Sequence, residues 1–315
     1  MPPLALSTSC LSRHHTCGEA MLEQAAQLGF DRVELGHGIP FSLWPGVRKA
    51  LRRGIVQVVS VHNFCPVPIG CSLSPNAYEF SDPDPRRRAR AVTHTLETLD
   101  SAAEVGASTV VLHLGSLPRL LRYDRIILDQ MKRGRWGSRT FCRAKVAAFS
   151  ACTQAWATTW PRIRDCLLQL VEPARQRTLR LGLENREVAA EFPLDDFWET
   201  ILADLPEDVF GHWHDFGHAA RKEASGFLSH LALLRRRAPR LLGCHLHDFT
   251  PPHHDHLLPG QGTLDFNALW SAIPPGTIFV LELSPRLTAQ DIEAWRPWWN
   301  QHGPRPASGS SSNSP

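Results

Sequence analysis

Eight short apolar runs, separated by longer segments with helical periodicity, constrain this chain of 315 residues more than any other feature. The runs fall at 4–7, 32–35, 55–61, 108–112, 180–183, 209–213, 241–246 and 277–283. Between them, segments such as 18–28, 86–105, 144–177 and 288–300 have the spacing of amphipathic helices, with apolar residues three and four positions apart. Strands that alternate with helices form parallel sheets. We therefore expect an α/β fold in which a helix follows each strand.

The even spacing of the eight units favours a single closed (β/α)8 barrel, or TIM barrel, over an open doubly wound sheet. No glycine-rich dinucleotide turn follows the first run. The predicted barrel domain covers 1–302. It carries an insertion after the fourth strand, at 117–142, which we expect to fold over the barrel mouth. The tail at 303–315 is rich in Pro, Gly and Ser, so we expect it to be disordered.

Composition excludes several classes of protein. The net charge of +3 is too small to indicate a nucleic-acid partner by itself. The eight cysteines are scattered and include no CxxC pair, so we interpret them as reduced thiols. No signal peptide precedes the first strand, and no apolar run approaches the roughly 18 residues of a membrane span. These features predict a cytoplasmic protein without a membrane partner.

Polar side chains gather where the apolar runs end. In a barrel these positions line the mouth at the C-terminal face, where catalytic residues lie. Carboxylate and imidazole groups that converge on one spot are most simply explained by a bound cation. A single histidine at a strand end is more often hydrogen-bonded or solvated than a ligand, but the coincidence of several favours a metal. The strand-end residues are Glu34, His37, His62, His113, Glu184, Asn185, His212, His214, Asp215, His218, His245, His247, Asp248 and Glu282.

Five motifs in order resemble those of the xylose isomerase-like TIM barrel superfamily. They are LEN at 183–185, DFGH at 215–218, CHLHD at 244–248, HLLPGQGTLDF at 256–266 and LEL at 281–283. The resemblance covers roughly residues 4–300. This superfamily includes sugar and sugar-phosphate isomerases and epimerases, and the endonuclease IV-type AP endonucleases (AP endonuclease family 2). The resemblance thus implies a metal-dependent enzyme on a barrel.

The resemblance to the isomerases and epimerases implies specific roles. Glu184, Asp215, His245 and Glu282 would bind the metal. Glu184 and Glu282 would also be catalytic, moving a proton on either side of a metal-bound enediolate. The substrate would be a small carbohydrate, with or without a phosphate group, and its expected contacts are His218, His62, His113 and Asn185. The oxygen-rich ligand set favours Mn, Co or Mg if one ion binds.

The resemblance to endonuclease IV supports an alternative, a phosphoester hydrolase with several zinc ions. His62, His113, His218 and His256 would then be additional ligands. Against this, His254 stands where that subgroup has an aspartate, and the sequence PGQG at 259–262 is more usual among the sugar enzymes. Nucleic acid is therefore the less favoured partner. Nine basic residues between Arg119 and Lys145 could bind a phosphate, although a solvated helix explains most of them.

A second alternative is a barrel that binds a ligand without catalysis. The presence of both Glu184 and Glu282 argues against it. The glycines of PGQG could contact a phosphate, but a tight turn is the simpler interpretation.

Overall fold

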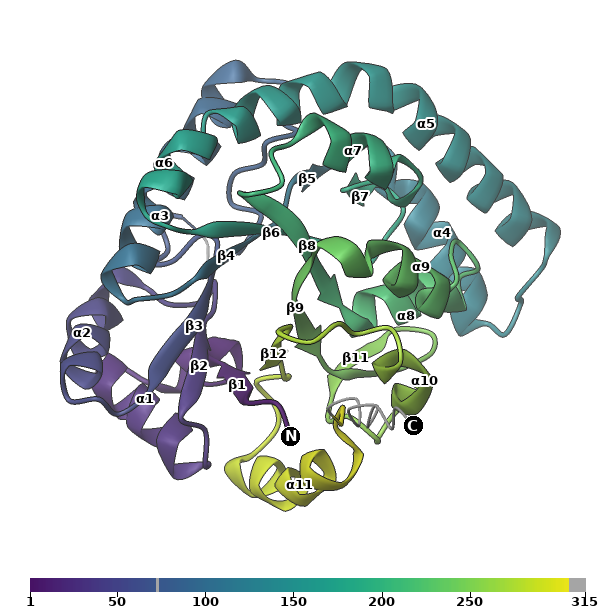
Figure 1. The fold of residues 1–315 in the computed structure, drawn as a ribbon. Coiled ribbons are helices and arrows are strands. Elements are labelled where there is room, and N and C mark those ends of the chain that lie inside the picture. Colours follow the sequence, from purple (N-terminus) through teal and green to yellow (C-terminus); the bar gives the residue numbers. More distant parts are fainter. Residues whose placement is uncertain (72–73, 306–315) are drawn as a thin grey trace, which may run out of the picture.

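All eight predicted apolar runs form parallel strands of a closed barrel (Figure 1). The computed structural model describes residues 1–71 and 74–305. Around the barrel the strand order is β1, β12, β9, β8, β6, β4, β3 and β2, and β1 pairs with both β12 and β2. The strands are β1 (Leu4–Ser7), β2 (Arg32–Leu35), β3 (Gln57–His62), β4 (Thr109–Leu112), β6 (Arg180–Glu184), β8 (Phe210–Asp215), β9 (Leu241–Leu246) and β12 (Ile278–Leu281). The prediction of a closed TIM barrel is confirmed.

The helices lie outside the strands, as Figure 1 shows. They are α1 (Gly18–Gln27), α2 (Trp44–Arg52), α3 (Pro85–Glu104), α4 (Leu121–Lys132), α5 (Arg139–Leu168), α6 (Val171–Gln176), α7 (Trp198–Asp204), α8 (Phe216–Ala224), α9 (His230–Arg237), α10 (Phe266–Trp270) and α11 (Ala289–His302). Short 3-10 segments include η1 (Thr8–Cys10), η2 (Ser12–His14), η3 (Phe41–Leu43), η4 (Asp195–Phe197) and η5 (Ala238–Arg240). Within the described residues, no helix is both long and apolar enough to cross a bilayer.

One large side chain fills the barrel beneath the mouth. Trp213 on β8 is fully buried and packs with small apolar residues of other strands, including Ala5 and Val280. Glycines stand beside it on both neighbouring strands, since a Cβ on Gly182 or Gly243 would press against the indole ring. Because side chains of a strand alternate between two faces, Asp215 follows Trp213 on the inner face and projects at the mouth. The interior packing thus positions a site residue.

The predicted insertion is a helical hairpin rather than a loop. It forms α4 and the start of α5, whereas the predicted helical segment at 144–177 is divided between α5 and α6. A small antiparallel pair, β5 (Gly115–Ser116) with β7 (Glu191–Phe192), joins the chain after β4 to the chain after β6. Asp124 of α4 accepts a hydrogen bond from Ala189 N at 3.1 Å. The hairpin therefore lies against the loop that follows β6. Residues 306–315 of the predicted tail lie outside the described residues.

Candidate metal centre

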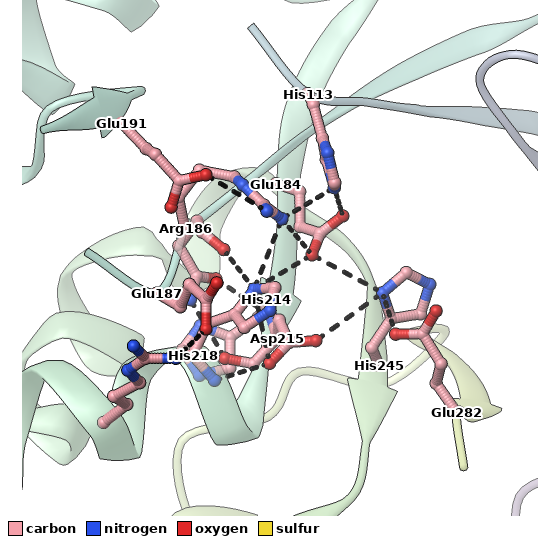
Figure 2. Close-up of polar contacts among 12 residues, drawn as sticks. His113, Glu184, Arg186, Glu187, Glu191, His214, Asp215, His218, His245 and Glu282 are labelled. Carbon is pink, nitrogen blue, oxygen red and sulfur yellow. Dashed lines mark hydrogen bonds and ion pairs between the residues drawn. The ribbon is translucent and has the colours of Figure 1, made fainter. Parts of the chain in front are cut away.

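Three predicted ligands surround a nitrogen atom of the fourth, His245, at the barrel mouth (Figure 2). His245 Nδ1 lies 3.8 Å from Glu184 Oε1, 3.8 Å from Asp215 Oδ2 and 3.3 Å from Glu282 Oε2. Glu184 and Asp215 are the last residues of β6 and β8, one and two residues beyond the predicted strand ends, and Glu282 directly follows β12. All four residues are buried. Among the described residues, His245 Nδ1 has no hydrogen-bond partner.

Glu34 determines which nitrogen of His245 carries the proton. This carboxylate is fully buried and accepts hydrogen bonds from Ser7 Oγ at 3.1 Å and Ser60 Oγ at 2.8 Å. His245 Nε2 lies 3.1 Å from each of its oxygens. A carboxylate only accepts, so Nε2 donates and the Nδ1 lone pair points at the other carboxylates. Carboxylate, histidine and cation in this order are the usual supporting arrangement of a metal-bound histidine.

The electrostatics of the centre call for a cation. Burial opposes protonation of His245, but the charges of Glu282 and Glu34 outweigh it and raise the pKa of His245 well above its usual range. Burial likewise opposes ionisation of Glu184, yet His113 and the other histidines around it hold the pKa of Glu184 well below its usual range. The lowered pKa values of Glu34 and Glu184 favour their ionised forms. A proton or a metal ion at Nδ1 would balance them.

Asp215 is held rigidly by its neighbours. His247 Nδ1 accepts from His256 N at 2.9 Å, so His247 Nε2 is the donor to the two oxygens of Asp215, at 3.0 and 3.1 Å. Asn185 donates to Asp215 O and accepts from Asp215 N, both at 2.9 Å. The amide oxygen and nitrogen of Asn185 are thus both engaged with the backbone of Asp215 and the residue is buried, so it supports Asp215. Contact of Asn185 with a substrate stays a prediction.

His62 and His113 both approach the outer oxygen of Glu184. Their Nε2 atoms lie 3.3 and 3.0 Å from Glu184 Oε2. Their Nδ1 atoms pair elsewhere, with Asn63 O at 2.9 Å and Asn76 Oδ1 at 3.0 Å respectively. These three side chains have the spacing of a second cation position.

A residue that the sequence analysis missed, Arg186, occupies this second position. Its Nη1 lies 2.6 Å from His113 Nε2 and 3.2 Å from Glu184 Oε1. Its other arm reaches Glu191 at 3.4 Å, and Arg186 is only 6% exposed. Arginine can only donate, so the His113 nitrogen is an acceptor here. Nothing in the sequence around LEN marks this residue as part of the centre.

His218 and His256 lie on the other side of Glu184. His218 Nδ1 is 3.1 Å from Glu184 Oε1, and although burial opposes it, Asp215 raises the pKa of His218 to about 9. His256 stacks on His247 with ring centroids 4.1 Å apart, and its Nδ1 lies 3.3 Å from Glu282 O. His256 belongs to a group with His247 and Glu282 whose spacing would suit a cation. His247 Nδ1, however, already accepts a hydrogen bond from His256 N.

The PGQG segment is a turn held by a buried carboxylate. Asp248 Oδ2 accepts from Gly260 N at 2.8 Å and from Gly262 N at 2.9 Å. Asp248 Oδ1 accepts from Leu264 N at 3.2 Å. The backbone N–H groups that could have bound a phosphate are therefore already used within the protein.

Comparisons with known proteins identify the family. The xylose isomerase-like TIM barrel family matches residues 22–298. No curated protein sequence matches the chain. Solved structures share the fold: a putative xylose isomerase from Rhodospirillum rubrum has 17% identity and a TM-score of 0.70, with 96% of this chain and 100% of that chain covered. A D-tagatose 3-epimerase-like protein has 16% identity and a TM-score of 0.66, with 96% and 97% covered. The IolI protein with a bound zinc atom has 13% identity and a TM-score of 0.62, with 95% and 96% covered. From the match over most of its length, the chain belongs to the xylose isomerase-like TIM barrel family.

Proposed function

We propose that this protein is a sugar isomerase or epimerase that uses one divalent metal ion, held by Glu184, Asp215, His245 and Glu282. The observation that carries the proposal is that His245 Nδ1, which has no hydrogen-bond partner among the described residues, faces the carboxylates of Glu184, Asp215 and Glu282. Three carboxylates and one imidazole form an oxygen-rich set that suits Mn²⁺, Co²⁺ or Mg²⁺. The names of the structural neighbours, a tagatose 3-epimerase-like protein and a putative xylose isomerase, support a small carbohydrate as substrate.

The two glutamates are the proposed proton carriers. A bound ion would polarise the carbonyl oxygen of a hydroxyketone and so acidify the neighbouring C–H bond. Glu282 lines an open cavity at the mouth and can reach a substrate carbon from that side. Glu184 approaches from β6, inside the ring of histidines, where His218 Nδ1 can donate to Glu184 Oε1 at 3.1 Å. A carboxylate on each side permits removal of a proton by one residue and its return by the other.

Arg186 favours this function over a hydrolase with several zinc ions. Such a hydrolase would need a second ion between His62, His113 and Glu184. Arg186 Nη1 already lies 2.6 Å from His113 Nε2, and a guanidinium cannot give up its charge. Two cations within this distance of each other repel strongly in a buried site. A protein that only binds a ligand is disfavoured because both proton carriers are present beside the proposed metal.

The test is a substrate screen with defined metal. The protein is stripped with a chelator, reloaded with Mn²⁺, Co²⁺, Mg²⁺ or Zn²⁺, and assayed on ketohexoses, on their 6-phosphates and on an oligonucleotide with an abasic site. We expect turnover of a sugar, with kcat reduced at least about 100-fold by Glu282→Gln. Glu187→Gln is the matched control, because Glu187 pairs with Arg221 outside the centre. Cleavage of the oligonucleotide without turnover of any sugar would overturn the proposal.

A further inference from the structure

Three residues that line the cavity beside Glu282 each carry a buried polar atom that has no hydrogen-bond partner among the described residues. The cavity has a volume of about 270 Å³, close to the lower end of the roughly 300–1,000 Å³ usual for small-molecule sites. Ser9, Ser12 and His37 are among its lining residues. Ser9 Oγ, Ser12 Oγ and His37 Nδ1 are each buried, and within the described parts of the chain none has a hydrogen-bond partner. Buried polar atoms are nearly always paired, so three orphans in one cavity indicate a missing ligand.

The loops that carry these atoms are held close together by glycine. Ser9 and Ser12 follow β1, in η1 and η2, and His37 lies two residues beyond the end of β2. A Cβ on Gly38 would lie 2.8 Å from Ser12 Oγ. Gly36 N donates to Thr8 Oγ1 at 2.9 Å, which ties the second loop to the first. The two serines and the histidine are therefore fixed relative to one another before a ligand arrives.

The cavity has the charge of a site for hydroxyl groups rather than for phosphate. In its neutral form the His37 ring offers one donor and one acceptor. A serine hydroxyl also donates and accepts. Among the described residues that line the cavity, Arg13 is the only lysine or arginine, and the charges of Asp255 and Glu282 oppose it. A dianionic phosphate would gain little from such surroundings.

We propose that Ser9, Ser12 and His37 form a subsite that binds the hydroxyl groups of an unphosphorylated sugar next to the proton carrier Glu282. The proposal rests on the proposed function for the reaction, and it adds the substrate class and the residues that select it. Each neutral group can exchange a donor and an acceptor with a sugar hydroxyl. The proposed substrate is thus a free ketose and not a sugar phosphate.

Kinetics and binding with matched serine variants test the subsite. The Mn²⁺-loaded protein is assayed with D-tagatose, D-psicose and D-fructose and with their 6-phosphates. Binding of D-sorbitol, which has no carbonyl group and cannot turn over, is measured by calorimetry. The variants are Ser9→Ala and Ser12→Ala. Ser284→Ala is the control, because Ser284 lines the same cavity but its hydroxyl already accepts from Arg286 N at 3.4 Å.

We expect kcat/KM to be higher for a free ketose than for its 6-phosphate. Ser9→Ala and Ser12→Ala should each raise KM and the sorbitol Kd about 3- to 10-fold, the loss of one neutral hydrogen bond. Ser284→Ala should change both by less than about 2-fold. The Tm of Ser12→Ala without ligand should be equal to that of the wild type or higher, because the substitution removes an unpaired buried hydroxyl. A purely structural serine would show the opposite change in Tm.

The possible outcomes separate the subsite from the proposed reaction. If ketoses are turned over but Ser9→Ala and Ser12→Ala behave like Ser284→Ala, the subsite is wrong and the reaction stands. Preference for the 6-phosphates, or no binding of sorbitol, also overturns the subsite. If sorbitol binds and Ser12→Ala weakens it while no sugar is turned over, the subsite stands and the proposed reaction is wrong.

Discussion

Replacing Glu34 by glutamine keeps the size of this buried side chain but removes the charge that orients His245. The carboxylate offers two equivalent acceptors, and His245 Nε2 lies 3.1 Å from each. The amide offers one acceptor and one donor. When the donor faces His245, the proton of the ring moves to Nδ1 and the lone pair that faces the other carboxylates is lost. The variant therefore acts on the metal centre without changing a ligand.

The expected size of the loss in metal affinity follows from the position of Glu34, which is hydrogen-bonded to the proposed ligand His245. Loss of such a supporting group usually weakens metal binding about 10- to 100-fold, which corresponds to roughly 1.4 to 2.7 kcal/mol. We expect a value within this range because Glu34 is fully buried and water cannot replace the lost acceptor. We expect Ser7 and Ser60 to hold the glutamine amide in place, because in the wild type their Oγ atoms lie 3.1 and 2.8 Å from the Glu34 oxygens. Loss of the whole site is therefore not expected.

Competition with a fluorescent chelator measures the Kd for Mn²⁺ or Co²⁺ in both proteins. Glu79→Gln is the control, because Glu79 also accepts from two serines, Ser81 Oγ at 3.2 Å and Ser116 Oγ at 3.0 Å, but touches no histidine of the centre. Its Kd should stay within about 2-fold of the wild type. Equal metal affinity of Glu34→Gln and wild type would refute the role of Glu34, and so would equal losses in the two variants.

Three further predictions concern charge. Arg186→Met removes the guanidinium beside His113 and Glu184. The number of bound metal ions per chain, measured by elemental analysis, should then rise from one to two, and a count of one in both proteins would contradict this. Burial raises the pKa of Asp124 to about 6 from its ordinary 3.8, so the folded protein favours the protonated carboxyl. As the pH rises from about 4 to about 6, the wild type should therefore lose up to about 3 kcal/mol of stability relative to Asp124→Asn, measured by urea unfolding. Unchanged differences across that pH range would rule this out. Asp195→Ala leaves two buried cations unpaired and should lower the free energy of unfolding by about 3 to 5 kcal/mol, against less than about 0.5 kcal/mol for the exposed Asp208→Ala.

The strands and the convergence of the four proposed ligands could be predicted because both depend on local patterns. That these four residues bind a metal stays a prediction. Apolar runs of the right length fix where each strand lies, and a polar residue at the strand end then faces the mouth. Glu184 and Asp215 agree best with the predicted position at a strand end, because they are the last residues of β6 and β8. The basic insertion was harder, because the same residues can form a loop or a helix, and contacts such as Asp124 with Ala189 decide which.

The supporting residues could not be predicted, because they depend on contacts across the barrel. Glu34 on β2 and His245 on β9 are 211 positions apart in the sequence. The closed barrel brings the Glu34 carboxylate within hydrogen-bond distance of His245 Nε2. Glu34 at least stood among the polar strand ends. Arg186 had no such signal, since a single arginine after a strand is normally a solvated residue.

The pairing of the buried charges favours a single ion at the proposed metal centre. Asp215 is paired with His247, and Glu34 with His245. Arg186 forms ion pairs with both Glu184 and Glu191. Among the described residues of the centre, His245 Nδ1 faces the carboxylates of the other proposed ligands without a hydrogen-bond partner, which leaves a place for one cation there. A second ion would have to displace Arg186 and leave Glu191 unpaired in the interior, and breaking a buried ion pair costs about 3 to 5 kcal/mol. In the proposed centre, the number of ions would thus be set by an arginine and its partner rather than by the histidines that could bind them.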